Sequence, residues 1–348
     1  MDRDQRRKVL VTGGAGFIGA NLADRLIAAG DAVTIFDNLS RRGAGQNLAW
    51  LRASYPEDFR FVQGDICDAG AISRAMQGIE VVYHLAAQTA VTTSVTDPRS
   101  DFEVNAAGTF NVLEAARLEG DDAILLFAST NKVYGGMEHI EVVEEASRYT
   151  YRDLPEGAAE SEPLDFHSPY GCSKGAADQY VRDYHRIYGL RTVVFRQSCV
   201  YGPRQMGVED QGWVAWFVIA AVLGKPLTIY GDGKQVRDLL YIDDLVNAYQ
   251  LATQHIDRTA GQIYNMGGGA ANTISVWTEF QPMLAEALGR PVPDPAFGDW
   301  RPGDQKVFFC DTSKAARDFG WRPKTGVAEG VKKLGQWVEA NRGLFEEA

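Results

Sequence analysis

Two side chains able to move a proton, Tyr170 and Lys174, lie four residues apart in a segment with a helical pattern. Residues at positions i and i+4 share one face of a helix, so the phenol and the ammonium are expected to lie side by side. A tyrosine with the ordinary pKa of about 10 is a poor base at neutral pH, and lowering that pKa by about 3 units takes roughly 4 kcal/mol. The ammonium and a positively charged cofactor ring would both favour the phenolate. We therefore expect Tyr170 to remove a hydroxyl proton, with Lys174 beside it.

A third polar residue, Thr130, follows the strand-like run 123–128 and can hydrogen-bond the same substrate hydroxyl. Tyr-x-x-x-Lys pairs also occur by chance on solvated helices, so their spacing alone does not establish catalysis. The prediction depends on a cofactor site earlier in the chain.

A glycine-rich turn near the start of the chain supplies such a site. Gly13, Gly16 and Gly19 have the spacing G-x-x-G-x-x-G, directly after the strand-like run Lys8–Thr12. Glycines there let the backbone approach a pyrophosphate, and the following helix offers free N–H groups to the anion. The turn therefore predicts a dinucleotide site.

The residues after the next two strands indicate which dinucleotide binds. Asp37 ends the second strand-like run, and a carboxylate there can bind both ribose hydroxyls and repel a 2′-phosphate. This favours NAD over NADP, although Arg41 and Arg42 nearby leave the preference open. Asp65 follows the third run and can accept from an adenine amino group. His84 ends the fourth run, before small residues, and is expected to be a satisfied buried histidine rather than a catalytic one.

The elements that must position these residues alternate between strand and helix. This order predicts an α/β, Rossmann-type doubly wound parallel sheet with a smaller, interleaved C-terminal substrate domain. Strands are expected at Lys8–Thr12, Ala32–Asp37, Phe59–Gln63, 81–85, 123–128 and Arg191–Gln197, and helices at 16–30, 72–76, 98–118, Ser168–Tyr188, Trp213–Leu223, 243–254, 276–288 and 327–341.

The domain boundaries follow from the same pattern. Residues 1–198, with about 234–268 returning to them, are expected to form the NAD-binding domain, and residues 199–233 and 269–348 the smaller domain. The acidic segment 137–162 lacks apolar periodicity and is expected to be an inserted loop.

Composition narrows the class of protein. The 348 residues carry a formal net charge of −11, which argues against a nucleic-acid groove or a polybasic membrane patch. The four cysteines and five histidines show no metal-ligand spacing, so no metal is expected. Free thiols and the lack of a long apolar segment predict a cytoplasmic protein.

Together these residues resemble the extended short-chain dehydrogenase/reductase family, the sugar-nucleotide epimerases and dehydratases, over essentially the whole chain. The motifs that carry the resemblance are 12–19, 37–38, 64–66, 84–88, Asn105, 129–135, 170–174, 201–204, 231–233, 237–238, 301–304 and 321–323. With the resemblance, the expected catalytic residues are Thr130, Tyr170 and Lys174. The expected NAD contacts are Gly13, Gly16, Phe17, Ile18, Asp37, Asn38, Ser40, Arg41, Asp65, Ile66, Leu85, Ala86, Ala87, Gln88, Asn105, Tyr170 and Lys174. The expected contacts to a nucleotide-diphosphate sugar are Asn131, Lys132, His167, Cys199, Gln205, Gln211, Arg237, Arg301 and Asp304, with the arginines facing phosphate oxygens.

The residues after Thr130 distinguish reactions within the family. Dehydratases of the family carry an acidic pair there, whereas this chain has Asn131 and Lys132. Asn131 cannot protonate a leaving hydroxyl and Lys132 replaces the carboxylate base, so dehydration and decarboxylation are disfavoured. A simple epimerase oxidises one carbon, lets the sugar present its other face and reduces it again.

The long run 164–180 most resembles family members that act on carbon 2 of a CDP-linked dideoxysugar. Cys199 stands where 4-epimerases tend to carry an asparagine, which is consistent with a differently seated sugar. A UDP-hexose 4-epimerase remains the alternative, and a non-catalytic NAD-binding sensor is a third. The resemblance also implies a homodimer or homotetramer that pairs through two helices per subunit, one of them carrying Tyr170.

Overall fold

A seven-stranded parallel sheet forms the centre of the computed structural model, which describes residues 6–120, 122–301 and 304–346. The strand order is β12-β8-β5-β4-β1-β2-β3, and each neighbouring pair is parallel. This order confirms the Rossmann-type doubly wound fold and places the switch point between β1 and β4. The strands are β1 (Lys8–Thr12), β2 (Ala32–Asp37), β3 (Phe59–Gln63), β4 (Val81–His84), β5 (Ile124–Thr130), β8 (Arg191–Gln197) and β12 (Gln262–Met266).

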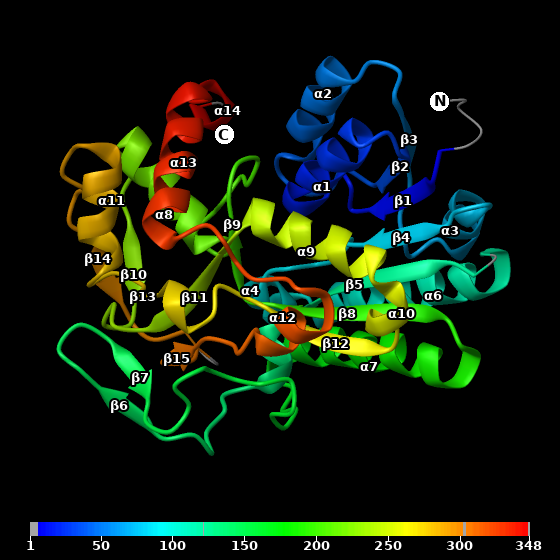
Figure 1. The fold of residues 1–348 in the computed structure, drawn as a ribbon. Helices are drawn as coiled ribbons and strands as arrows, with labels where there is room; N and C mark the ends of the chain where they lie inside the picture. The colour runs from blue at the N-terminus through cyan, green and yellow to red at the C-terminus, as the bar shows by residue number, and fades with distance from the viewer. Residues whose placement is uncertain (1–5, 121, 302–303, 347–348) are drawn as a thin grey trace.

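Helices cover both faces of this sheet, because successive strand residues point to opposite sides and both sides are apolar. Val9 and Val11 of β1 lie in a core cluster with α1 and α9, whereas Leu10 lies in a second cluster with α3, α6 and α7 (Figure 1). The helices around the sheet are α1 (Phe17–Ala28), α2 (Ala44–Ser54), α3 (Ala69–Met76), α4 (Val91–Thr96), α5 (Pro98–Phe102), η2 (Glu103–Ala107), α6 (Gly108–Glu119), η3 (Asn131–Tyr134), α7 (Ser168–Tyr188), α9 (Ile242–Gln254), α10 (Ile256–Thr259) and α12 (Ser313–Phe319).

Several elements of this region were not predicted, among them α2, α4, α10, α12 and β12. Helix α2 has weak apolar periodicity and was missed. The helix expected over 98–118 is interrupted by η2, a π-helical turn that holds Asn105 at its centre. Such turns often occur at functional sites.

The smaller part of the molecule contains a second sheet and a helical layer. Strand β11 pairs in parallel with β9 and β15 and antiparallel with β13. Segment 234–268 was expected to return to the main sheet; α9, α10 and β12 lie there, whereas β11 belongs to the smaller sheet. The elements are β9 (Cys199–Tyr201), α8 (Trp213–Leu223), β10 (Thr228–Tyr230), β11 (Val236–Tyr241), η4 (Ala270–Asn272), β13 (Thr273–Ser275), α11 (Phe280–Leu288), β14 (Ala296–Gly298), β15 (Val307–Phe308), α13 (Val327–Ala340) and α14 (Gly343–Glu346).

Helix α11 begins four residues later than predicted. The backbone N–H groups of Val276 and Trp277 donate to the carbonyls of Gln235 and Gly233, so these residues leave the helical path. Ser275 and Glu279 then cap each other's backbone N–H groups, which starts the helix at Phe280.

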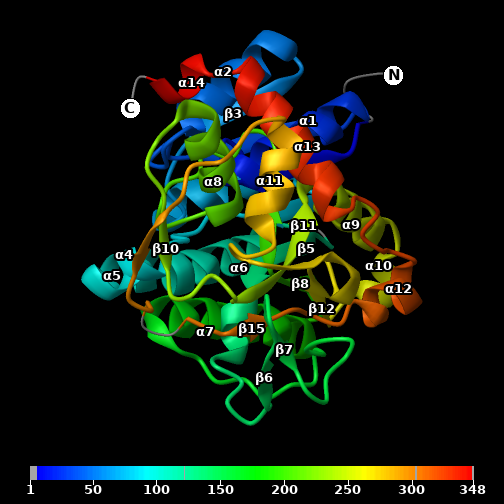
Figure 2. The ribbon, with the colours of Figure 1, turned by 90° about the vertical axis from the view of Figure 1, so that its left-hand side faces the viewer.

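The segment 137–162, expected to be an irregular loop, contains an antiparallel hairpin of β6 (Val142–Glu144) and β7 (Tyr149–Tyr151). Figure 2 shows the hairpin at the lower end of the molecule, beside β15. Tyr149 and Tyr151 lie in an apolar cluster with Val236 and Phe308. Each strand has only three residues, too few to show a clear period in the sequence, which explains the wrong prediction.

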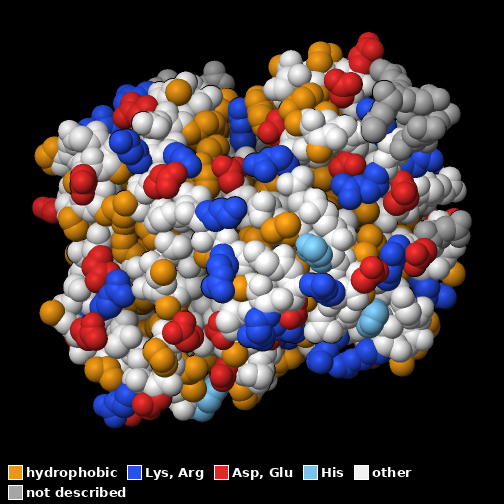
Figure 3. Space-filling view, in the orientation of Figure 1, with side chains coloured by type: hydrophobic (Ala, Val, Ile, Leu, Met, Phe, Trp, Pro, Cys, Tyr) orange, Lys and Arg blue, Asp and Glu red, His pale blue; other side chains and the backbone are white. Residues whose placement is uncertain are grey.

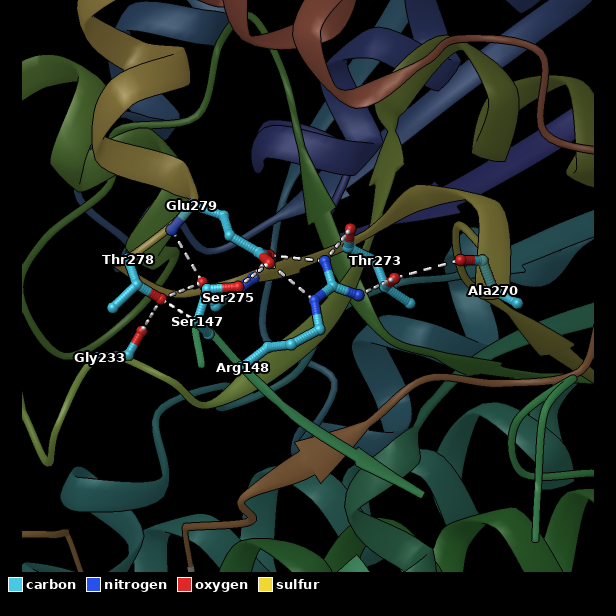
Figure 4. Close-up of polar contacts among 8 residues, drawn as sticks. All are labelled: Ser147, Arg148, Gly233, Ala270, Thr273, Ser275, Thr278 and Glu279. Carbon is cyan, nitrogen blue, oxygen red and sulfur yellow. Dashed lines mark hydrogen bonds and ion pairs between the residues drawn. The ribbon is translucent and has the colours of Figure 1, made fainter. Parts of the chain in front are cut away.

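A polar cluster fastens this hairpin to β13 (Figure 4). The guanidinium of Arg148 donates to both carboxylate oxygens of Glu279, at 2.8 and 2.6 Å, and to the Thr273 hydroxyl at 3.1 Å. Ser147 adds a hydrogen bond to Glu279 at 2.8 Å. The hairpin is therefore tied to the strand that pairs with β11.

The two parts of the molecule also meet at Arg204. Its guanidinium lies 3.8 Å from the ring centre of Trp50 in α2 and 5.6 Å from that of Trp337 in α13. On the face drawn in Figure 3, basic and acidic side chains are interspersed. Among the helices described, none is long and apolar enough to span a membrane.

Candidate active site

The glycine turn lies directly against the end of β4. Gly13 has a φ of +67°, and a Cβ there would lie 2.7 Å from the Ala86 nitrogen. A Cβ at Gly19 would lie 2.2 Å from the Gly13 oxygen. Both positions therefore require glycine. Phe17 and Ile18 follow, half-buried, in the first turn of α1.

The carboxyl ends of β2 and β3 bring three predicted cofactor residues together. Asp37 accepts hydrogen bonds from the backbone N–H groups of Ala15 at 3.0 Å and Leu39 at 2.8 Å. Asn38 donates to Asp65 at 2.9 Å and accepts from the Ser40 N–H at 3.0 Å. The neighbouring Ile66 is buried against Gly108 of α6, below the polar residues at these strand ends.

His84 is a satisfied core residue, as expected. Its Nδ1 lies 2.7 Å from the Thr12 hydroxyl and its Nε2 lies 3.0 Å from the Thr109 hydroxyl. Burial, and to a lesser degree the charge of Lys174, lower its pKa to about 3. His84 is therefore neutral at physiological pH.

A chain of hydrogen bonds leads from the end of β4 to α7. Leu85, Ala86 and Ala87 are half-buried, and the Gln88 N–H that follows donates to the Asn105 side chain at 2.9 Å. The Asn105 amide in turn donates to the Ser173 hydroxyl at 3.2 Å. Ser173 directly precedes Lys174, so the structure brings the β4 loop, η2 and α7 together.

Tyr170 is buried near the start of α7, where its backbone N–H donates to the Ser94 hydroxyl at 3.1 Å. Burial raises the pKa of its phenol to about 12, although a hydrogen bond with Thr130 and the positive charge of Arg41 act to lower it. The expected lowering by Lys174 is therefore wrong for the protein alone. Removing the phenol from water outweighs the charges around it.

Lys174 extends under the end of β5 instead of reaching Tyr170 as a direct charge partner. Its Nζ donates to the Ala128 carbonyl at 2.7 Å and lies 4.2 Å from the centre of the Phe127 ring. Burial lowers the pKa of this ammonium to about 7, against the opposing charges of Asp178 and Asp101. Tyr170 and Lys174 thus both contact β5, at Thr130 and at Ala128. With a pKa of about 7, Lys174 is close to half-protonated at neutral pH.

Several predicted substrate residues form a charged group around β11. The Arg237 guanidinium is buried and donates to Asp304 at 2.6 Å. Burial lowers the pKa of Lys132, and the nearby charge of Arg237 acts in the same direction while Asp304 and Cys199 oppose it. Asn131 begins η3, and its side-chain oxygen accepts from the Thr130 hydroxyl at 3.4 Å. Lys132 and Arg237 are thus two neighbouring cations, and such a pair can hold a phosphate group.

The remaining predicted residues lie around the turn 208–211. Arg41 donates to Gln211 at 2.8 Å, and Arg301 donates to Asp210 at 3.1 Å. Gln205 is buried and donates to the Val200 carbonyl at 3.4 Å. His167 is exposed, immediately before α7, and within the described part of the chain no side-chain hydrogen bond joins it to the others. Pro302 and Gly303 of the 301–304 motif lie outside the described residues.

Sequence reasoning missed Asp101, which is fully buried beside Asn105 and Ser173. Its position four residues before Asn105, within the predicted helix, was the signal that could have found it.

These residues fit a dinucleotide. A side chain at Gly13 would clash with the backbone of Ala86, and one at Gly19 with the backbone of Gly13, so the tight turn at the switch point depends on both glycines. Asp37 uses two backbone donors, but a carboxylate has about four acceptor positions, so it can still accept from ribose hydroxyls.

Comparisons with known proteins agree with this geometry. Residues 10–334 match the family model described as GDP-mannose 4,6 dehydratase. The chain is 44% identical to a CDP-paratose 2-epimerase of Salmonella typhi, over 96% of this chain and 99% of that protein. It is 36% identical to a UDP-glucose 4-epimerase of Mycolicibacterium smegmatis, over 94% and 96% of the two chains. The chain belongs to the extended short-chain dehydrogenase/reductase family.

A solved member of this family has the same fold. The dTDP-glucose 4,6-dehydratase of Streptomyces venezuelae, determined with NAD bound, has a TM-score of 0.83 and 32% identity, covering 98% of this chain and 99% of its own. The resemblance noted in the sequence is thus confirmed, including the subgroup indicated by the run 164–180. In this chain Thr130 is followed by Asn131 and Lys132.

Proposed function

We propose that this protein is an NAD-dependent nucleotide-sugar epimerase that inverts carbon 2 of a CDP-linked dideoxyhexose, interconverting CDP-paratose and CDP-tyvelose. The observation that carries the proposal is the group Thr130, Tyr170 and Lys174 at the ends of β5 and α7, followed by Asn131 and Lys132. The 44% identity to a CDP-paratose 2-epimerase supports the choice of substrate.

The residues of the chain would divide the work as follows. When bound, NAD supplies the reversible two-electron oxidation of the sugar carbon. Tyr170 takes the proton of the carbon-2 hydroxyl, while Thr130 orients that oxygen through the hydrogen bond it shares with Tyr170. After the sugar presents its other face, Tyr170 returns the proton to the same oxygen, so no net proton is consumed.

Different parts of the chain are proposed to bind NAD and the nucleotide sugar. We assign the cofactor phosphates to the turn containing Gly13 and Gly16, and the ribose to Asp37. Arg237 and Lys132 are proposed to hold the sugar-nucleotide diphosphate, because they are cations close to each other and Lys132 follows Thr130 by two residues. This separation lets the sugar turn while the nucleotide stays bound.

The absence of an acidic pair argues against dehydration. A dehydratase must protonate a leaving hydroxyl and remove a proton from the neighbouring carbon, which takes an acid and a base beyond Tyr170. Asn131 and Lys132 cannot fill both roles as a carboxylic acid and a carboxylate would. An epimerase needs neither.

A UDP-hexose 4-epimerase is the second candidate, favoured by the 36% identity to a UDP-glucose 4-epimerase. Cys199 beside Lys132 is the observation that favours carbon 2, since it replaces the asparagine typical of 4-epimerases. All four cysteines are free, which supports a cytoplasmic location.

The experiment mixes the purified holoenzyme with CDP-, UDP- and GDP-linked sugars and follows the sugars by proton NMR. Inversion at carbon 2 of a CDP-linked sugar is expected, and Tyr170→Phe should lower the rate by about 10²–10⁴-fold. Inversion only at carbon 4 of a UDP-hexose would replace the first candidate by the second. A Tyr170→Phe protein as active as the wild type would contradict the role of Tyr170, and a holoenzyme that inverts none of these sugars would favour the non-catalytic NAD-binding sensor.

A further inference from the structure

Asp101 is a fully buried carboxylate that stands outside the predicted catalytic set. One of its oxygens accepts from the Ser173 hydroxyl at 2.5 Å. The other accepts from the side-chain amides of Gln88 at 2.9 Å and Asn105 at 3.1 Å. These three donors are neutral side chains. A charge buried in this way is costly unless hydrogen bonds and nearby cations offset it.

The three donors come from the three elements that surround the proton-transfer pair. Gln88 lies in the loop after β4, three residues beyond the end that contacts the glycine turn. Asn105 is the centre of the π-helical turn η2, and Ser173 precedes Lys174 on α7. One carboxylate thereby fixes the cofactor side of the site relative to α7.

We propose that Asp101 is a positioning residue for the Tyr170–Lys174 pair: it ties α7 to the β4 loop, and its charge keeps Lys174 an ammonium in an apolar site. This inference rests on the proposed function. Asp101 acts through Ser173 and through its field, and it is not proposed to touch the substrate.

Two carboxylates favour the ammonium form of Lys174, Asp178 more strongly than Asp101. Asp178, on the same helix, is also near, but it already forms a two-point ion pair with Arg196, with both distances 3.0 Å. His84 of β4 also faces Lys174, and its lowered pKa of about 3 keeps it neutral. Asp101 is thus the nearby carboxylate whose hydrogen-bond donors are uncharged.

The same charge acts on Tyr170. Asp101 raises the pKa of its phenol, while Thr130 of β5 and Arg41 of the loop after β2 lower it. Neutralising Asp101 should therefore lower the pKa of both groups at once. Both limbs of the pH–rate profile should then move to lower pH together, which loosened packing alone would not cause.

The test compares three variants of the holoenzyme. Asp101→Asn removes the charge and keeps the size of the side chain. Ser173→Ala removes the hydrogen bond at 2.5 Å and keeps the charge. Asp97→Asn is the matched control, because Asp97 is an exposed carboxylate that caps the same helix α5. Thermal unfolding checks that each variant is folded, and Asp101→Ser replaces Asp101→Asn if the latter unfolds without cooperativity.

The readouts are the pH dependence of kcat and kcat/KM and an ultraviolet difference titration of the phenol against Tyr170→Phe. In Asp101→Asn, both limbs and the phenol titration are expected to move to lower pH by about 0.5–1 unit. Ser173→Ala should lower kcat with its limbs unmoved, and Asp97→Asn should match the wild type.

The inference would be overturned if, in Asp101→Asn, the limbs of the pH–rate profile and the phenol titration stayed in place or moved to higher pH. Such a result would leave the proposed function intact, because that function is tested separately by the panel of nucleotide sugars and by the activity of Tyr170→Phe. The two failures are therefore distinguishable.

Discussion

At the scale of single residues, the site depends on groups whose charge is compensated within the protein. Arg237 is buried against Asp304, and Lys132 lies close enough for its pKa to respond to both. A phosphate that binds Arg237 must therefore compete with Asp304 for the same guanidinium. The carboxylate lowers affinity for the anion but keeps a buried cation paired.

This competition predicts opposite effects of two substitutions. Arg237→Ala should weaken binding of CDP by roughly 10- to 100-fold, because charge-assisted hydrogen bonds are lost. Asp304→Asn should strengthen binding by about 3- to 10-fold, because the guanidinium is freed. Isothermal titration of each variant with CDP measures both, and Arg42→Ala, on the exposed loop after β2, is the control. Equal weakening by Arg237→Ala and Asp304→Asn would show that Asp304 itself serves binding.

Residue types and spacing predicted the Tyr170–Lys174 helix face, the glycine turn and the buried state of His84. They did not predict the pKa of Tyr170, because burial is a property of the fold that spacing does not reveal. Asp101 was missed for a related reason: its role comes from donors on Gln88 and Ser173, which are distant in the sequence.

At the scale of elements, strands were predicted well because β-branched and apolar runs in a parallel sheet are continuous. The observed bounds of β1, β2, β3 and β8 equal the predicted ones. The insertion 137–162 was predicted poorly, since its hairpin is held by contacts to β11, β13 and β15 instead of by its own periodicity. We call the polar cluster of Arg148, Glu279 and Thr273 the hairpin clamp. The clamp supports β11, because Arg237 of β11 pairs with Ile274 of β13.

Removing the hairpin clamp should therefore weaken binding of the nucleotide sugar more than binding of NAD. Arg148→Ala is expected to raise KM for the sugar nucleotide by roughly 3- to 10-fold, with NAD affinity unchanged. It should also lower Tm by roughly 2–4 °C. Arg152→Ala is the matched control, since the Arg152–Glu141 pair lies on the same hairpin but is exposed. A variant Arg148→Ala with wild-type KM would contradict the positioning role of the insertion.

The stabilisation that the hairpin clamp contributes should also depend on pH. Burial alone would raise the pKa of Glu279, but hydrogen bonds from Arg148 and two serine residues lower it to about 2. Its stabilisation is thus present above the unfolded value of about 4.3 and is lost as pH falls toward 2. The Tm difference between wild type and Arg148→Ala should be full at pH 7 and much smaller at pH 3. A difference that does not change with pH would contradict the ion pair as its cause.

At the scale of the whole molecule, α6 and α7 lie on the face of the main sheet opposite α1 and α9, and they expose large apolar side chains. Phe110 and Tyr180 pack edge to face at 6.1 Å between ring centres and are 43% and 52% exposed. Ile187 and Leu118 add two aliphatic side chains on the same two helices, each 65% exposed. We propose that a second copy covers this surface through a four-helix contact, as the resemblance implied.

A charge placed in this surface should separate the subunits. Phe110→Glu is expected to convert a dimer into a monomer in light scattering coupled to size exclusion, because a carboxylate would be buried without a partner. Phe297→Glu on β14, where the apolar side chain is 59% exposed but lies in the smaller part, should leave the mass unchanged. A wild-type protein that elutes as a monomer would refute the assembly.

The central claim is that inversion proceeds by oxidation and re-reduction of the same sugar carbon, with Tyr170 moving only the hydroxyl proton. The most direct measurement incubates the holoenzyme with CDP-paratose in D₂O and examines carbon 2 of the product by NMR. We predict that the inverted carbon keeps its original hydrogen and carries no deuterium, because the transferred hydrogen never exchanges with water. Deuterium at carbon 2 of the inverted sugar would show that a carbon-bound proton is removed instead, and would contradict the account.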